Sequence, residues 1–179
     1  MNTAKLDAEL ERKNLEGYWN VRARGHKADA PHLWKWADLH DGLMQASEQI
    51  GFEFSDESLQ TIPATDVDAF DGYLLRYVNP ATSGYTLPTM SCEVQLLKPR
   101  MATRFHRHTS TVLCFVFKGR GRTRIGEGCL EWEKGDCFVI PHWQWHGHET
   151  GDDDEAILFS INDKPISEAL SLYREEAWK

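Results

Sequence analysis

The spacing of apolar residues along the chain changes near residue 70. Before that point apolar residues recur every three or four positions, which predicts helices over residues 4–19 and 39–50. Residues 22–30 read as a loop, and the polar, proline-containing stretch 52–69 reads as irregular. The pattern therefore predicts a helical and irregular N-terminal arm over residues 1–69.

Beyond residue 70 apolar and polar residues alternate, as expected of β-strands. A first strand is predicted around Leu74, Leu75, Tyr77 and Val78. Further strands are predicted at residues 90–98, 102–108, 111–118, 121–126, 129–133, 136–140, 145–149 and 155–161. Glycine-containing hairpin turns are expected between them at Gly119, Gly121, residues 126–128 and residues 134–136.

Short strands at this spacing, with no helix between them, are typical of an antiparallel sandwich or barrel. Residues 166–178 predict a closing amphipathic helix, with Leu170 and Tyr173 on its apolar side. The predicted fold class is therefore all-β, with a domain at residues 70–179 that follows the helical arm and ends in a C-terminal helix.

Composition limits the location and the partners of the protein. The chain is 41% hydrophobic and 27% charged, which is typical of a globular domain. It has no apolar run of about 18 residues that could span a bilayer, and its first residues lack an apolar signal core. A formal net charge of −8 opposes binding to nucleic acid. We therefore expect a cytoplasmic protein with neither a membrane nor a nucleic-acid partner.

The cysteines do not form a recognisable metal or redox motif. Cys92, Cys114, Cys129 and Cys137 include no CxxC pair, so zinc-knuckle and thioredoxin-type sites are excluded. Cys114 and Cys137 lie within apolar strand patterns, which predicts small buried thiols. No structural disulfide is expected in a cytoplasmic protein.

Three histidines form the candidate metal site. His106 and His108 alternate along one predicted strand, so their side chains share a face at a separation of roughly 7 Å. His146, from a later strand, could supply a third nitrogen. Such a set suits Fe(II), Zn, Mn, Ni or Cu. The alternative is three barrel histidines satisfied by hydrogen bonds. His148 has the parity to face inward beside His146.

The strand pattern, together with His106-x-His108 and Gly135-x5-Pro141-x4-His146, resembles the cupin family. That resemblance implies an antiparallel jelly-roll β-barrel. Counting back from Gly119, Val112 stands where cupins usually have a glutamate ligand. Trp143 stands where they usually have a glycine after the proline.

A narrower resemblance is to the gentisate dioxygenase family, which includes salicylate and hydroxynaphthoate dioxygenases. The strings that carry it are Pro31-His-Leu-Trp-Lys-Trp-Ala-Asp, Tyr77-Val-Asn-Pro, Leu87-Pro-Thr-Met, His106-Arg-His-Thr, Gly119-Arg-Gly-Arg-Thr, Trp143-Gln-Trp-His and Leu158-Phe-Ser-Ile. They look like the N-terminal arm of that family joined directly to its second cupin half. The resemblance implies Fe(II) and cleavage of a hydroxylated aromatic acid, chelated through its carboxylate and hydroxyl with O2 alongside.

The residues around the histidines suggest how the substrate would be held. Arg104 lies two residues before His106 and could clamp a carboxylate, or it could turn to solvent. One of the two indoles beside Gln144 is expected to wall the pocket, and Gln144 itself could bond a substrate hydroxyl. The predicted substrate-binding set is Arg104, Val112, Trp143, Trp145 and His148, with Arg104 and Gln144 as catalytic residues. A row of arginines, Arg120, Arg122 and Arg124, is expected to face outward because cations are costly to bury.

Two other functions stay open at this point. One is a metal-dependent isomerase or decarboxylase, which would use no O2; the missing glutamate at Val112 argues against a decarboxylase that needs a carboxylate for proton transfer. The other is a non-enzymatic small-molecule-binding barrel, which the absence of a first cupin half keeps open. A homodimer or higher homo-oligomer is expected.

Overall fold

The computed structural model describes residues 32–49, 60–61, 69–152 and 155–178. The helix predicted over residues 4–19, the loop at 22–30 and most of the irregular stretch 52–69 lie outside the described residues. The helix predicted over 39–50 is confirmed as α3 (Trp36–Gln49). No helix within the described ranges has the length and apolar character needed to cross a membrane.

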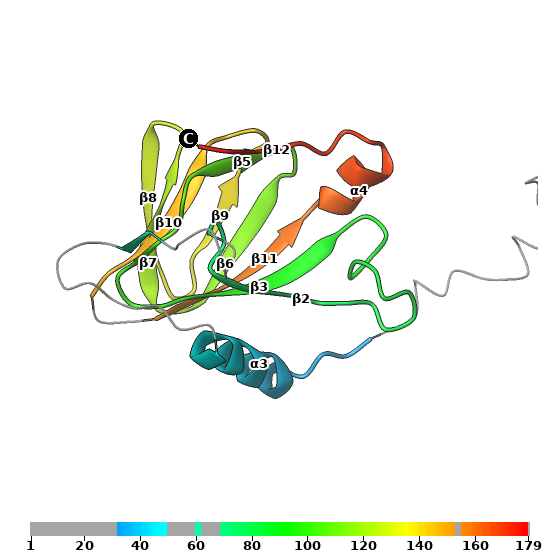
Figure 1. Cartoon of the computed structure of the whole chain (residues 1–179), viewed down its shortest axis with the longest axis horizontal. Coiled ribbons are helices and arrows are strands. Elements are labelled where there is room, and N and C mark those ends of the chain that lie inside the picture. The colour runs from blue at the N-terminus through cyan, green and yellow to red at the C-terminus, as the bar shows by residue number, and fades with distance from the viewer. Residues whose placement is uncertain (1–31, 50–59, 62–68, 153–154, 179) are drawn as a thin grey trace, which may run out of the picture.

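Two sheets face each other and form a jelly-roll sandwich (Figure 1). The first has five strands in the order β2 (Tyr73–Arg76), β3 (Ser91–Leu97), β11 (Ala156–Asn162), β6 (Val112–Lys118) and β9 (Cys137–Ile140). The second has seven strands: β1 (Gln60–Thr61), β4 (Met101–Ala102), β10 (His146–Thr150), β5 (His106–His108), β12 (Glu175–Ala177), β7 (Arg120–Ile125) and β8 (Gly128–Glu133). The predicted all-β jelly roll is therefore confirmed, and the stretch predicted as one strand at 102–108 divides into β4 and β5.

Strand β10 occupies the centre of the second sheet. Along one side it pairs antiparallel with β7 over its whole length, and along the other with β4 and β5. The single β10–β5 register pair is His146↔His106. Residues far apart in the sequence are thereby brought to one level of the sheet.

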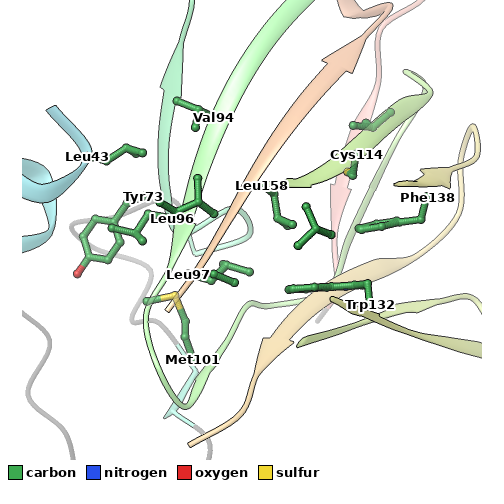
Figure 2. Packing of buried hydrophobic residues seen from close by; sticks show 14 of the residues in the cluster. Leu43, Tyr73, Val94, Leu96, Leu97, Met101, Cys114, Trp132, Phe138 and Leu158 are labelled. Carbon is green, nitrogen blue, oxygen red and sulfur yellow. The ribbon is translucent and has the colours of Figure 1, made fainter. Parts of the chain in front are cut away.

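The barrel interior changes from apolar to polar along its axis. At one end Leu97, Val116, Leu158 and Trp132 are buried in the hydrophobic core shown in Figure 2. Further along the same strands the inward positions become polar. These positions are Glu93 and Gln95 on β3, and Ser160 and Asn162 on β11. The apolar end supplies the burial that stabilises the barrel, and the polar end is left to line a cavity.

Helix α3 covers the outer face of the five-stranded sheet beside β2 and β3 (Figure 1). Its Leu43 is fully buried in the cluster that contains Val94 and Leu96. Just before the helix, the Trp34 indole N–H donates to the carbonyl of Val78 at 3.2 Å. The indole of Trp36 lies 4.3 Å from the ring of Phe117. Both tryptophans therefore contact the barrel.

The predicted helix at 166–178 is wrong over most of its length. Helix α4 spans only Lys164–Ala169, and Ser171 then adopts a left-handed backbone with φ 57° that ends it. The chain continues into β12, which pairs with β5. Leu170, expected on the apolar side, is 63% exposed. The edge of β5 would otherwise leave backbone N–H and C=O groups without a partner, and pairing with β12 satisfies them.

Two smaller predictions are also corrected. Cys137 is exposed, because on β9 it alternates with the inward-facing Phe138, whereas Cys114 is buried as expected. Gly121 lies inside β7 and not in a turn. It is required there by close packing, since a Cβ at this position would lie 2.5 Å from the carbonyl oxygen of Glu149. All four cysteines are free thiols, in agreement with the expected absence of a disulfide.

Candidate metal centre

The three predicted histidines converge at the polar end of the barrel. One side-chain nitrogen from each of His106, His108 and His146 lies within 4.8 Å of the other two. The ring centroids are 5.3 Å apart for His106 and His108, 4.3 Å for His106 and His146, and 4.9 Å for His108 and His146. Strand alternation on β5 places the first pair, and the β5–β10 register adds the third. The arrangement is the three-histidine metal site that the sequence predicted.

Backbone carbonyls fix the tautomers of two of the rings. Nδ1 of His108 lies 2.9 Å from the carbonyl oxygen of Ser110, and Nδ1 of His146 lies 2.8 Å from that of Gln144. A carbonyl oxygen can only accept, so each Nδ1 carries the proton and donates it. The lone pair of each ring is then on Nε2, which is the form a metal ligand needs.

The surroundings also keep the imidazoles of His108 and His146 neutral. Burial, reinforced by the nearby His106, lowers the pKa of His146 to about 2. Burial and the same neighbour lower the pKa of His108 and bring that of His148 to about 3. His108 and His146 therefore offer a metal ion free bases, and it need not displace protons from them. Imidazole nitrogens fit a small divalent transition metal.

His106 is held on three sides by residues from distant parts of the chain. Phe70 stacks on its ring with centroids 5.0 Å apart, and Asp71 Oδ1 lies 3.9 Å from its Nε2. Glu175 Oε1, from β12, lies 3.6 Å from its Nδ1. The contact with His106 lowers the pKa of Glu175 to about 2 although partial burial raises it, and the Tyr173 hydroxyl, which donates at 2.9 Å, assists.

The histidines open onto a cavity of about 140 Å³. Val112 and His148, both predicted to face the substrate, line it. Its lining also contains the carboxylates Asp71, Glu93 and Glu175 and the ammonium of Lys164. Thr123 fixes the ring of His148, whose Nδ1 lies 2.8 Å from the Thr123 hydroxyl. The same hydroxyl accepts a hydrogen bond from Trp132 Nε1 at 2.8 Å.

The other predicted substrate residues are not brought to this cavity. The Arg104 guanidinium lies over the Phe70 ring at 5.7 Å. The ring centroids of Trp143 and Trp145 each lie 4.5 Å from the guanidinium carbon of Arg107. Gln144, which lies between the two tryptophans in sequence, is exposed. Trp143 has a left-handed φ of 60°, the conformation that favours the glycine it replaces. The turn therefore directs these side chains away from the cavity lining.

The outward arginine row is as predicted: Arg122 and Arg124 form ion pairs with Glu149 on the outer surface of the second sheet.

Sequence reasoning missed most of the polar lining. Glu93 and Gln95 are two residues apart on β3, so their side chains point to the same face, and the strand pattern could have indicated both. Tyr173 and Glu175 gave no such signal, because they were assigned to the closing helix predicted at 166–178, and Lys164 lay outside every predicted element. Tyr173 and Glu175 reach the cavity only because the chain turns back after α4.

The comparisons with known proteins agree with this geometry. The model of the Cupin domain matches residues 93–162. The chain is 49% identical over 109 residues to the 5-aminosalicylate 1,2-dioxygenase of Comamonas sp, a match that covers 61% of this chain and 29% of that protein. It is 38% identical over 149 residues to the gentisate 1,2-dioxygenase of Haloferax sp, covering 83% of this chain and 36% of that protein. The chain thus spans about a third of the length of these curated relatives.

Among solved structures, the salicylate 1,2-dioxygenase of Pseudoaminobacter salicylatoxidans in adducts with gentisate matches with a TM-score of 0.66 at 27% identity. That match covers 80% of this chain and 36% of the other. Fold, histidine geometry and sequence thus point the same way. The chain contains a cupin domain and is homologous, over part of their length, to the gentisate, 5-aminosalicylate, 1-hydroxy-2-naphthoate and salicylate 1,2-dioxygenases.

Proposed function

We propose that this protein is a non-haem Fe(II)-dependent dioxygenase that cleaves the ring of a hydroxylated aromatic acid of the gentisate or salicylate type. The observation that carries the proposal is the set of three converging imidazoles that open onto a cavity with Val112 in place of a carboxylate ligand. Three protein ligands leave adjacent coordination positions open, as in non-haem iron oxygenases.

His106, His108 and His146 would hold the ion. When bound, Fe(II) would supply positions for the carboxylate and hydroxyl oxygens of the acid and for O2, and a route for electrons between the ring and O2. Affinity alone does not select iron over copper or zinc. The choice of iron rests on the similarity to the dioxygenases.

Other residues of this chain can bind the substrate carboxylate and accept a proton from its hydroxyl. Lys164 carries the one ammonium group in the cavity lining and can pair with the substrate carboxylate. Asp71, on the cavity wall, can accept the proton that the substrate hydroxyl gives up on binding. The cavity of about 140 Å³ is small beside the roughly 300–1,000 Å³ of sites for drug-sized ligands. It therefore favours a one-ring acid over a two-ring acid.

The roles predicted for Arg104, Trp143, Gln144 and Trp145 require a substrate that extends beyond the cavity lining. Variants at these positions test that requirement directly. We expect them to alter KM for acids with bulky ring substituents and to leave small acids unaffected.

One observation favours a second candidate function. Three carboxylates, Asp71, Glu93 and Glu175, line the cavity with the histidines. Their charge opposes entry of an anion, and a carboxylate near a metal can move protons in a decarboxylase or isomerase without O2. Either reaction, or ligand binding without reaction, is therefore the alternative to test.

The test is anaerobic reconstitution of the full chain with Fe(II), followed by oxygen-electrode assays. The panel is salicylate, gentisate, 5-aminosalicylate and 1-hydroxy-2-naphthoate, with hydroquinone as the ring that lacks a carboxylate. We expect O2 uptake matched to loss of substrate for the one-ring acids, and little with hydroquinone. Light scattering on the same sample tests the expected homodimer.

The matched variants are His108→Ala, which should abolish turnover, and His142→Ala. The His142 side chain is exposed and its Nδ1 bonds the carbonyl of Thr109 outside the cavity lining, so this variant should retain full turnover. Substrate loss without O2 uptake would identify a decarboxylase or isomerase. Binding without any turnover by the iron-loaded protein would identify a binding barrel. Either result would overturn the proposal.

A further inference from the structure

The C-terminal strand is built into the wall of the metal centre. Strand β12 pairs antiparallel with β5, the strand that carries two of the ligands, with Glu175 opposite His108 and Ala177 opposite His106. The backbone N–H of Trp178 donates to the carbonyl of Phe105 at 2.8 Å beyond the strand. The ligand strand is thereby paired on both sides, with β10 and with β12.

Alternation along β12 separates two neighbouring carboxylates. Glu176 faces away from the cavity and forms an ion pair with Arg107, whose Nη2 lies 2.6 Å from Glu176 Oε2. Glu175 faces the cavity. Its Oε1 lies 3.6 Å from Nδ1 of His106, and its Oε2 accepts a hydrogen bond from the Tyr173 hydroxyl at 2.9 Å. The tyrosine thus holds one oxygen while the other approaches the imidazole.

The Nδ1 atom of each of the three histidines has a polar neighbour, but the neighbouring group differs. Nδ1 of His108 and of His146 each donate to a backbone carbonyl two residues away. Nδ1 of His106 instead faces a carboxylate from the far end of the chain. A carboxylate acceptor makes a hydrogen bond about twice as strong as a neutral one. It also raises the basicity of the imidazole as a ligand.

We propose that Glu175 is a positioning residue of the metal centre, which orients His106 so that its Nε2 faces the ion. The observed 3.6 Å lies within about half an ångström of hydrogen-bonding range. Carboxylate partners of ligating histidines change metal affinity by about 10–100-fold when removed. The C-terminal strand is then a functional part of the site and not only an edge of the sheet.

The test measures Co(II) affinity of the metal-free full chain by competition with a chromophoric chelator. Glu175→Ala should bind Co(II) about 10–100-fold more weakly. Glu175→Gln keeps an acceptor oxygen and should lose several-fold less. Glu176→Gln, on the opposite face of the same strand, is the matched control and should stay within twofold of the unmodified protein. Equal affinity of Glu175→Ala and the unmodified protein would overturn the inference.

A double-mutant cycle shows whether Glu175 acts through His106. In a His106→Ala background, Glu175→Ala should cause no further loss of affinity, because the ring it orients is gone. A further loss of tenfold or more would instead make Glu175 a direct ligand and overturn the positioning role. If Glu175→Ala does not fold, Glu175→Leu, which also lacks an acceptor oxygen, carries the same cycle, and its unchanged affinity would overturn the inference.

This inference rests on the metal centre of the proposed function but needs no substrate or O2. Failure of the unmodified protein to bind Co(II) would remove the centre and both proposals together. Normal binding combined with no ring cleavage would remove only the dioxygenase, and leave the role of Glu175 standing.

Discussion

Binding of a metal ion should stabilise the whole barrel, because its ligands come from strands that unfolding separates. His106 and His108 lie on β5, and His146 lies on β10, joined to β5 by one register pair. No equivalent site exists in the unfolded chain, so binding free energy adds to folding free energy. The perturbation is the addition of Co(II), or anaerobic Fe(II), to the metal-free protein, and its reversal with a chelator.

The size of the effect follows from the ligand concentration. At a free metal concentration one hundred times Kd the stabilisation is about 2.7 kcal/mol. For a chain of 179 residues, each 1 kcal/mol moves Tm by about 2–4 °C. The expected rise is therefore about 5–11 °C, which differential scanning calorimetry resolves easily.

Removing one ligand should remove most of that rise. Four-ligand zinc sites release about 10–16 kcal/mol, or about 2.5–4 kcal/mol for each ligand, so His146→Ala should weaken binding by at least about a hundredfold. At the same metal concentration the stabilisation then falls to about 0.4 kcal/mol, or about 1–2 °C. His142→Ala, outside the cavity lining, should keep the full shift. A full shift in His146→Ala, or none in the unmodified protein, would refute the reasoning.

Three further predictions concern the framework. Gly121→Ala would place its Cβ 2.5 Å from the carbonyl oxygen of Glu149 and should lower the free energy of unfolding in urea by about 1–3 kcal/mol or more. In the control Gly128→Ala the nearest atom to the new Cβ is at 3.5 Å, so the loss should be far smaller. Equal losses in the two variants would contradict the packing argument. Thr123→Val strips the fully buried hydroxyl that bonds both Trp132 and His148, and should cost about 2–4 kcal/mol; Thr123→Ser keeps the hydroxyl and should recover most of this in the same assay. Glu155→Gln removes the negative charge of this carboxyl, whose pKa the hydrogen bond from Lys118 lowers, and should cost about 0.5–1 kcal/mol at neutral pH. Because the folded pKa is below the unfolded one, that stability exists above the unfolded pKa and is lost as pH falls. The variant and the unmodified protein should therefore begin to converge below about pH 4 and meet once the pH is under the folded pKa. A gap that persists below that point would rule out the ion pair as its source.

Local sequence pattern determined the strands and the metal ligands. Alternation of apolar and polar residues is a property of each strand's own backbone, so the strands of the barrel could be predicted one by one. The same alternation placed His106 and His108 on one face, and the cupin spacing added His146. His148 was predicted to face the site by the same parity and Val112 by its place in the cupin motif, and both line the cavity.

Tertiary structure alone decided the rest of the site. Residues 166–178 carry a helical pattern, yet β12 forms because β5 offers an open ladder edge that no local pattern reveals. Trp143 and Trp145 stand beside a ligand in sequence, but a left-handed turn directs them to Arg107. Glu175 reaches His106 only after the chain has closed on itself. Side-chain direction along a strand is set by nearest neighbours, whereas contacts across a barrel depend on how all strands pair. The sequence by itself therefore determined the ligands of the metal centre, and the assembled sheets determined what surrounds them.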